Sequence, residues 1–169
     1  MIVYYPKKIE DKGGVRGQYG HVIDVLPTTL DLIGIKAPDK IRGIAQDEIQ
    51  GTSLTYSIDD AKAASRHTTQ HYYIFGSRAI YQDGWKAALP YPNTFITGNA
   101  KSNKPFDENA WELYNLTEDY TERVDLAKKN PEKLAELNAL FEEQAKKYKL
   151  YQLITWDDVL NGRIHRTKG

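Results

Sequence analysis

The chain has 169 residues, of which 40% are hydrophobic and 27% charged, which is typical of one soluble globular domain or of one lobe of a larger protein. Basic and acidic side chains both number 23, so the net charge is zero, and we exclude a domain that binds nucleic acid by neutralising phosphates. Cysteine is absent, which excludes disulfides, thiolate metal sites and a cysteine nucleophile. No apolar run is long enough for a membrane span, and the N-terminus lacks the pattern of a signal peptide.

The first part of the chain predicts a strand, a loop and a helix. Residues 1–5, MIVYY, are rich in β-formers and predict a short strand, which a glycine-rich polar loop follows. In HVIDVLPTTLDLIGI, apolar residues recur at helical spacing, at Val22, Leu26, Leu30 and Ile33. Asp24 fits the N-cap, Pro27 the first turn and Gly34 the position after the last turn.

From residue 70 the pattern changes to short β-rich runs and then to one long helix. We expect strands at 70–75, 78–82, 84–89 and 111–116, with Asp83-Gly84 as a strong signal for a two-residue hairpin turn. The segment NPEKLAELNALFEEQAKKYKL predicts an amphipathic helix that Asn130 caps and that has Pro131 at its first position. Its apolar stripe consists of Leu134, Leu137, Phe141, Ala145 and Tyr148.

The predicted fold class is therefore α+β. About four antiparallel strands pack against the long C-terminal helix, and the strand–loop–helix before them is expected to be the tail end of a larger α/β domain. The remaining stretches are irregular: 36–69, with one helical turn near 59–64, and 90–109, rich in Pro, Asn and Gly. We expect three parts: the end of the larger domain at 1–50, a small sheet-and-helix subdomain at 51–153, and a tail at 154–169.

The glycines and serines of the chain do not form a recognised catalytic motif. Gly14, Gly17 and Gly20 are spaced GxxGxxG, whereas a phosphate-binding loop would need GxGxxG or GxxxxGK[ST], so a flexible connection is the favoured interpretation. No serine lies in a GxSxG elbow, and nothing marks a partnered histidine and aspartate. The serines are Ser53, Ser57, Ser65, Ser77 and Ser102.

Histidines and paired carboxylates raise the question of a metal. His67 and His71 are four residues apart, but the glutamate between them and the third ligand of a zinc hydrolase are missing. The pairs Asp59-Asp60 and Asp157-Asp158 lack the alternating oxygen donors of a calcium loop, which favours capping and surface roles. We therefore predict no metal site in this chain.

The segment 111–125, WELYNLTEDYTERVD, has the densest mixture of aromatic and acidic side chains. Trp111, Leu113 and Leu116 alternate with polar residues as in a half-buried strand, and the acids that follow fit a turn. A strand and a turn are thus favoured over a binding site.

Three blocks in order resemble the C-terminal portion of type I sulfatases, the arylsulfatase branch of the alkaline-phosphatase-like superfamily. HVIDVLPTTLDLIGI resembles the family's (H)xxD-(I/L)-x-PT-x-L helix, and ASRHTTQHYYIFGSRAIYQDGWKAAL resembles its HxTQYFEM-GNRAIYHDGWKA block, from which His71 and Ile74 depart. WELYNLTEDYTERVDLAKKNPEKL resembles WELYNL-ED-(S/T)E-x-x-DLA and the terminal helix. The resemblance covers residues 1 to about 153.

The resemblance implies an aryl sulfate ester hydrolase whose catalytic residues lie upstream. Family members use calcium and a formylglycine made in a C/S-x-P-x-R motif, and this chain has neither cysteine nor that motif around any serine. We carry over no catalytic residue and expect no cofactor in this chain, which we predict to be inactive alone. The residues of this chain that are candidates for contact with the substrate's aglycone are His67, Thr68, Gln70 and Arg78. A purely stabilising role for these four side chains stays open.

The expected partners are the missing N-terminal sulfatase domain and, for the parent, a sulfate ester, with neither nucleic acid nor membrane. The sequence assigns this chain no compartment, and the resemblance implies a periplasmic or secreted parent. If the first strand and helix belong to a larger sheet, the isolated piece exposes apolar surface and tends to form homo-oligomers. The rival interpretation is a standalone binding or protein-interaction domain that keeps the sulfatase fold without its chemistry.

Overall fold

The computed structural model describes residues 1–91 and 110–150, and the chain divides into two units, Met1–Thr68 and Thr69–Gly169. The predicted tail at 154–169, the Asp157-Asp158 pair and most of the excursion at 90–109 lie outside the described residues. None of the helices formed by the described residues is long and apolar enough to cross a membrane.

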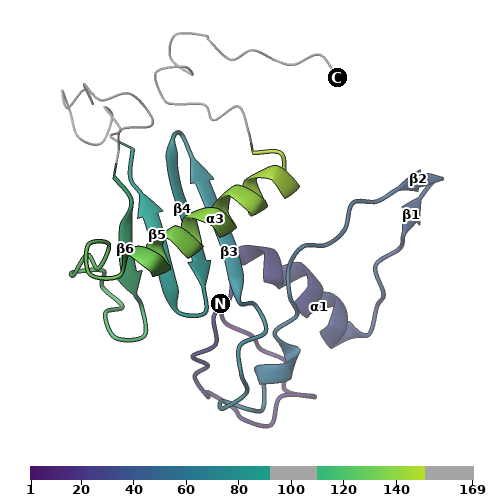
Figure 1. Ribbon diagram of the computed structural model, residues 1–169. Helices are drawn as coiled ribbons and strands as arrows, with labels where there is room; N and C mark the ends of the chain where they lie inside the picture. The colour runs from purple at the N-terminus through teal and green to yellow at the C-terminus, as the bar shows by residue number, and fades with distance from the viewer. Residues whose placement is uncertain (92–109, 151–169) are drawn as a thin grey trace. The chain divides into compact units, whose positions relative to one another are not determined.

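An antiparallel sheet dominates the second unit (Figure 1). Its four strands lie in chain order: β3 Thr69–Ile74, β4 Ser77–Gln82, β5 Trp85–Leu89 and β6 Glu112–Asn115. The four strands predicted from residue 70 onwards are confirmed to within one residue at each end, and the α+β fold class is confirmed.

Two-residue turns join the first three strands. Asp83 and Gly84 have φ angles of 46° and 86°, and Phe75 and Gly76 have 45° and 95°. Positive φ at both central positions gives a turn whose twist matches that of the flanking strands. The Asp83-Gly84 turn is therefore confirmed. Phe75 adopts a left-handed backbone conformation that is uncommon for phenylalanine, so the sequence does not predict this turn.

The core of the second unit lies between the sheet and helix α3, Pro131–Lys147, which crosses the sheet diagonally (Figure 1). At most 1% of each core side chain is exposed: Ile80, Ala87 and Leu113 from the strands, and Leu137, Phe141 and Ala145 from the helix. The predicted stripe is confirmed for Leu134, Leu137, Phe141 and Ala145, whereas Tyr148 lies past the helix at its C-cap and stacks on His71. Pro131 occupies the first turn. Asn130 occupies the N-cap position, and its backbone carbonyl accepts the first helical hydrogen bond, from the Leu134 N–H. Its side chain forms no capping hydrogen bond.

The segment 111–125 forms a strand followed by a turn, as predicted. On β6, Leu113 is fully buried, while the Tyr114 hydroxyl donates to the Glu112 carboxylate at 2.8 Å. Burial is the main cause that raises the pKa of Tyr114, and the hydrogen bond to Glu112 raises it further. The phenol therefore stays protonated over the physiological pH range. After the strand, Asp119 accepts neighbouring backbone N–H groups and Glu122 pairs with Lys86, so these two acids stabilise the turn.

Asp119 organises that turn. Its carboxylate accepts the N–H groups of Val124 at 2.8 Å and Arg123 at 2.7 Å and the hydroxyl of Thr121 at 3.1 Å. The Val124 bond, with the other two, holds the pKa of this carboxyl below its usual value of 3.8. The ionised form therefore stabilises the folded state above the unfolded-state pKa.

We expect the stabilising effect of Asp119 to depend on pH. Because its folded-state pKa is lowered, the stabilisation is complete above the unfolded value of 3.8 and is lost as pH falls through the folded value. The urea midpoint of Asp119→Ala should lie below that of the unaltered chain at about pH 6, and the gap between the two midpoints should narrow as the pH falls below 3.8. A gap that stays constant over this range would contradict the assignment, and Glu118→Ala serves as the control.

The first unit contains the predicted helix. A 3-10 turn, Val22–Asp24, leads into α1, Val25–Ile33, and Gly34 ends the helix with φ 73°, the left-handed conformation that glycine adopts without steric cost. A second 3-10 turn, η2, is at Thr55–Ser57, so the helical turn predicted near 59–64 is wrong in position. The Leu54 N–H donates to the Thr28 hydroxyl, a tertiary contact beside η2 that local propensity does not reveal.

Residues 1–5 do not form the predicted strand. Met1, Ile2 and Tyr4 are 72%, 98% and 87% exposed, and the carbonyl of Tyr5 accepts the N–H groups of Lys8 and Ile9 in a turn. A strand requires a neighbour that completes its backbone hydrogen bonds, and no described strand pairs with this segment.

An unpredicted hairpin follows α1. Strands β1, Lys40–Ile41, and β2, Ile44–Ala45, pair at the end of an arm that extends away from the helix (Figure 1). Each strand has only two residues, which is too short for a periodic pattern in the sequence.

Candidate functional site

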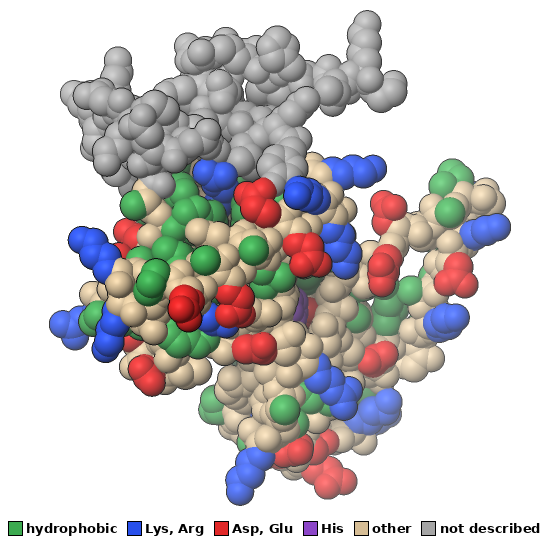
Figure 2. Space-filling model, in the orientation of Figure 1, with side chains coloured by type: hydrophobic (Ala, Val, Ile, Leu, Met, Phe, Trp, Pro, Cys, Tyr) green, Lys and Arg blue, Asp and Glu red, His purple; other side chains and the backbone are tan. Residues whose placement is uncertain are grey.

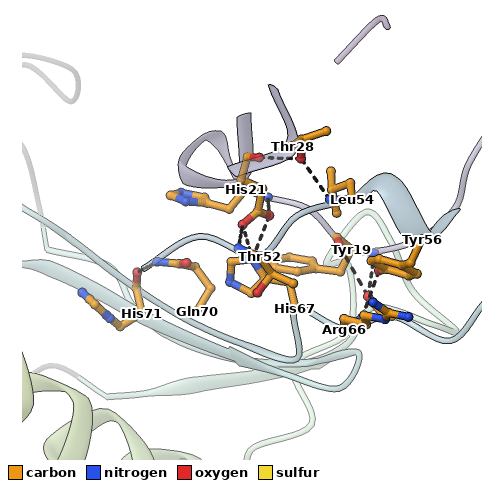
Figure 3. Close-up of polar contacts among 12 residues, drawn as sticks. Tyr19, His21, Thr28, Thr52, Leu54, Tyr56, Arg66, His67, Gln70 and His71 are labelled. Atoms are coloured by element: carbon orange, nitrogen blue, oxygen red, sulfur yellow. Dashed lines mark hydrogen bonds and ion pairs between the residues drawn. The ribbon is translucent and has the colours of Figure 1, made fainter. Parts of the chain in front are cut away.

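Asp24, the most buried polar residue of the first unit, forms a pair with His67. The Nδ1 atom of His67 lies 2.8 Å from Oδ1 and 2.7 Å from Oδ2 of Asp24 (Figure 3). The Asp24 side chain is completely buried and His67 is 6% exposed. A buried carboxylate is tolerated only where charges or donors compensate it, and His67 is one of three such partners.

Backbone donors complete the coordination of Asp24. Its Oδ2 accepts the N–H of His21 and its Oδ1 accepts the N–H of Thr52, each at 2.7 Å. One carboxylate therefore links the turn before α1, the loop at 51–54 and the segment that ends the unit. Glycine is required beside it, because a Cβ at Gly51 would lie 2.1 Å from the carbonyl oxygen of Ile23.

Thr28 extends this network by one turn of the helix. Its hydroxyl donates to the Asp24 carbonyl at 2.6 Å and accepts the N–H of Leu54 at 2.9 Å (Figure 3). The residue is 3% exposed. The PTT sequence at the helix start thus fastens α1 to the loop that follows the hairpin arm.

Aromatic rings enclose the imidazole of His67. The ring of Tyr19 meets it edge-on at 5.3 Å between centroids, and that of His21 at 6.4 Å. The carboxylate beside Nδ1 favours the tautomer that carries its proton there and fixes the orientation of the ring. This is how an aspartate orients a catalytic histidine, but burial keeps the ring from bulk solvent, so the arrangement best supports a positioning role.

Asp24 has a different role from the one the sequence predicts. The N-cap position is confirmed, but its side chain makes no cap hydrogen bond to α1 and instead bonds to residues 28 and 43 positions further along the chain. Sequence reasoning missed the pairing with His67 because no local spacing joins two residues so far apart.

The four residues proposed to contact substrate have different environments. In the first unit, His67 is buried against Asp24 and Thr68 is exposed. In the second unit, Gln70 donates to the carbonyl of His71 at 2.7 Å, and the Arg78 guanidinium lies over the Trp111 ring at 5.9 Å. Alternation along the paired strands β3 and β4 places Gln70 and Arg78 on opposite faces of the sheet. Their contact with a substrate stays a prediction.

The residues that the structure describes do not fit a calcium site, and the sequence does not fit a formylglycine. Among residues 1–91 and 110–150, no three His, Asp or Glu side chains gather in a way that could hold a metal. Asp59 accepts the N–H groups of Glu10 and Asp11, and the His71 ring stacks on Tyr148 at 4.9 Å, so these candidates have structural contacts. The sequence contains no cysteine from which formylglycine could be made.

Comparison with known proteins shows which solved structures have a similar fold. No protein-family model matches the chain. Among solved structures it is similar to BT4656, solved with its substrate D-glucosamine-2-N,6-O-disulfate, at 23% identity and a TM-score of 0.50, over 77% of this chain and 24% of that one. It is also similar to a protein of Bacteroides thetaiotaomicron VPI-5482 assigned as a sulfatase, at 23% identity and 0.51, over 78% of this chain and 26% of that one. Ps i-CgsB matches at 19% identity and 0.51, over 83% and 28%.

The fold of the chain is therefore sulfatase-like, and the predicted resemblance is confirmed at the level of the fold. The chain spans about a quarter of the length of the structures it matches, between 24% and 28%.

Proposed function

We propose that this chain is the C-terminal, non-catalytic part of an arylsulfatase-type sulfuric ester hydrolase, which supports the catalytic part and borders its substrate pocket. The observation that carries the proposal is the combination of a sulfatase-like fold over a quarter of the matched chains with the absence of a C/S-x-P-x-R motif. The nucleophile and the calcium ligands would then be supplied by the rest of the protein.

The exposed apolar surface of the first unit supports the proposal that the chain is part of a larger protein. Along α1 and its flanks, apolar side chains are exposed by between 43% and 73%: Val22, Val25, Leu26, Ile33 and Ile35. A soluble chain seldom exposes an apolar helical face of this kind unless a partner covers it. The Asp24–His67 network would fix the position of this face relative to the loop at 51–54.

Among the four residues, the exposure of Thr68 supports a role for it in substrate contact. It is exposed, while its neighbour His67 is held rigidly by Asp24. The backbone at Thr68 would therefore be positioned precisely enough to select among aglycones, which is how a positioned loop contributes to specificity.

The chain alone is expected to show no turnover of 4-nitrophenyl sulfate in the presence of calcium, because it lacks the residues that form the nucleophile. The longer protein, expressed with its upstream coding sequence, should hydrolyse the same ester. Turnover by the purified chain, which persists through further purification, would overturn the proposal, and so would an upstream sequence without a C/S-x-P-x-R motif.

A further inference from the structure

The β1–β2 hairpin is built for a defined conformation. Its central residues, Arg42 and Gly43, have φ angles of 50° and 83°, which is the pattern of the tight turn that suits a two-residue hairpin. Ile41 and Ile44 are direct cross-strand partners, so both side chains lie on the same face of the ribbon. The hairpin therefore has one small apolar face.

That face has no packing within the chain as described. Ile41 is 49% and Ile44 70% exposed, and every residue from 40 to 48 is exposed. Figure 2 shows hydrophobic and basic side chains together at the end of the arm. A single two-stranded hairpin is marginally stable in water, so a formed hairpin with an uncovered isoleucine pair lacks the burial that would maintain it.

The arm is continuous with the exposed face of α1. The helix ends at Gly34, and Ile35, at 55% exposed, begins the segment that leads to the hairpin. The apolar side chains of α1 and of the hairpin therefore follow one another along the chain within one unit. A single large partner surface would cover both, and about three quarters of each matched sulfatase-fold chain lies outside the part that this chain matches.

We propose that the β1–β2 hairpin is a docking arm that packs its Ile41 and Ile44 side chains onto the larger α/β part of the sulfatase. This inference rests on the proposed function and names the contact by which the chain would attach. The partner surface must be apolar where the isoleucines insert, and Lys40 and Arg42 favour acidic groups at its rim.

Hydrogen exchange tests the docking arm on two proteins, the chain alone and the longer protein encoded with its upstream sequence. In the chain alone, the amides of residues 40–45 should exchange nearly as fast as in an unfolded peptide. In the longer protein they should exchange at least about a hundredfold more slowly, because docking closes the hairpin against local opening.

Substitution separates docking from folding. In the longer protein, Ile41→Ser with Ile44→Ser should raise the exchange rate of these amides by about tenfold or more, since two buried apolar side chains are lost. The same double variant should leave the unfolding midpoint of the chain alone unchanged. The control is Val15→Ser, a substitution at an 86% exposed residue outside the arm and α1.

The outcomes distinguish the two proposals. If the longer protein hydrolyses an aryl sulfate but its hairpin amides exchange as fast as in the chain alone, the docking arm is refuted and the proposed function stands. If the double variant unfolds the chain alone, the isoleucines pack within the chain, and the docking arm is also refuted. If slow exchange already occurs in the chain alone and disappears on dilution, the occupant is a second copy of this chain. A longer protein without sulfatase activity refutes the proposed function.

Discussion

Replacing Asp24 with alanine is expected to destabilise the first unit by about 3–5 kcal/mol, because it removes the acceptor of three hydrogen bonds that meet at a buried carboxylate. The N–H groups of His21 and Thr52 and the ring of His67 would each lose their acceptor, the fully buried Asp24 carboxylate. The effect should appear as loss of amide protection over residues 19–28 and 51–54, measured by hydrogen exchange in increasing urea.

A double-mutant cycle tests whether the pair acts as one unit. His67→Ala alone should also be strongly destabilising, and the double variant Asp24→Ala/His67→Ala should cost clearly less than the sum of the single variants. Asp31→Ala, on the exposed side of the same helix, is the matched control and should change stability by less than about 0.5 kcal/mol. Additive single effects would show that the two side chains stabilise the unit independently.

Replacing Phe141 with alanine is expected to destabilise the second unit by about 3–5 kcal/mol, which is the usual cost of removing a buried phenylalanine. Its ring is 1% exposed and meets Trp111 edge-on at 5.5 Å between centroids. The cavity would open between α3 and the sheet. Strand pairing would prevent Ile80, Ala87 and Leu113 from moving to fill it.

Urea unfolding followed by tryptophan fluorescence measures this effect directly, because Trp85 and Trp111 both pack against the core. Glu142→Ala, the neighbouring exposed residue on α3, is the control and should leave the midpoint nearly unchanged. A loss below about 1 kcal/mol for Phe141→Ala would mean that α3 is only loosely attached to the sheet.

The second unit was largely predictable because its signals are local. The stripe from Leu134 to Ala145 recurs at helical spacing, and the Asp83-Gly84 pair marks a hairpin through the backbone conformation that it favours. Each of these features depends on residues a few positions apart. The acids after β6 were predicted as turn residues for the same reason.

The candidate site was less predictable because its contacts join distant residues. The sequence predicts Asp24 as a helix-cap residue and singles out His67 by its spacing from His71 and by the family resemblance, whereas the pair depends on a separation of 43 residues. No spacing rule connects two such positions. The short strands β1 and β2 were missed because two residues each cannot establish a period.

The sequence by itself determined that the chain lacks a cysteine and a C/S-x-P-x-R motif, and that four strands and a long helix form an α+β fold. These conclusions follow from residue identity and short-range periodicity. Only the tertiary structure decided that hydrogen bonds from His21, Thr52 and His67 compensate the burial of Asp24. It also decided that residues 1–5 pair with none of the described strands and that the hairpin exposes its isoleucines. The physical reason is that burial and hydrogen-bond satisfaction depend on which distant segments meet, and a linear sequence states this only indirectly.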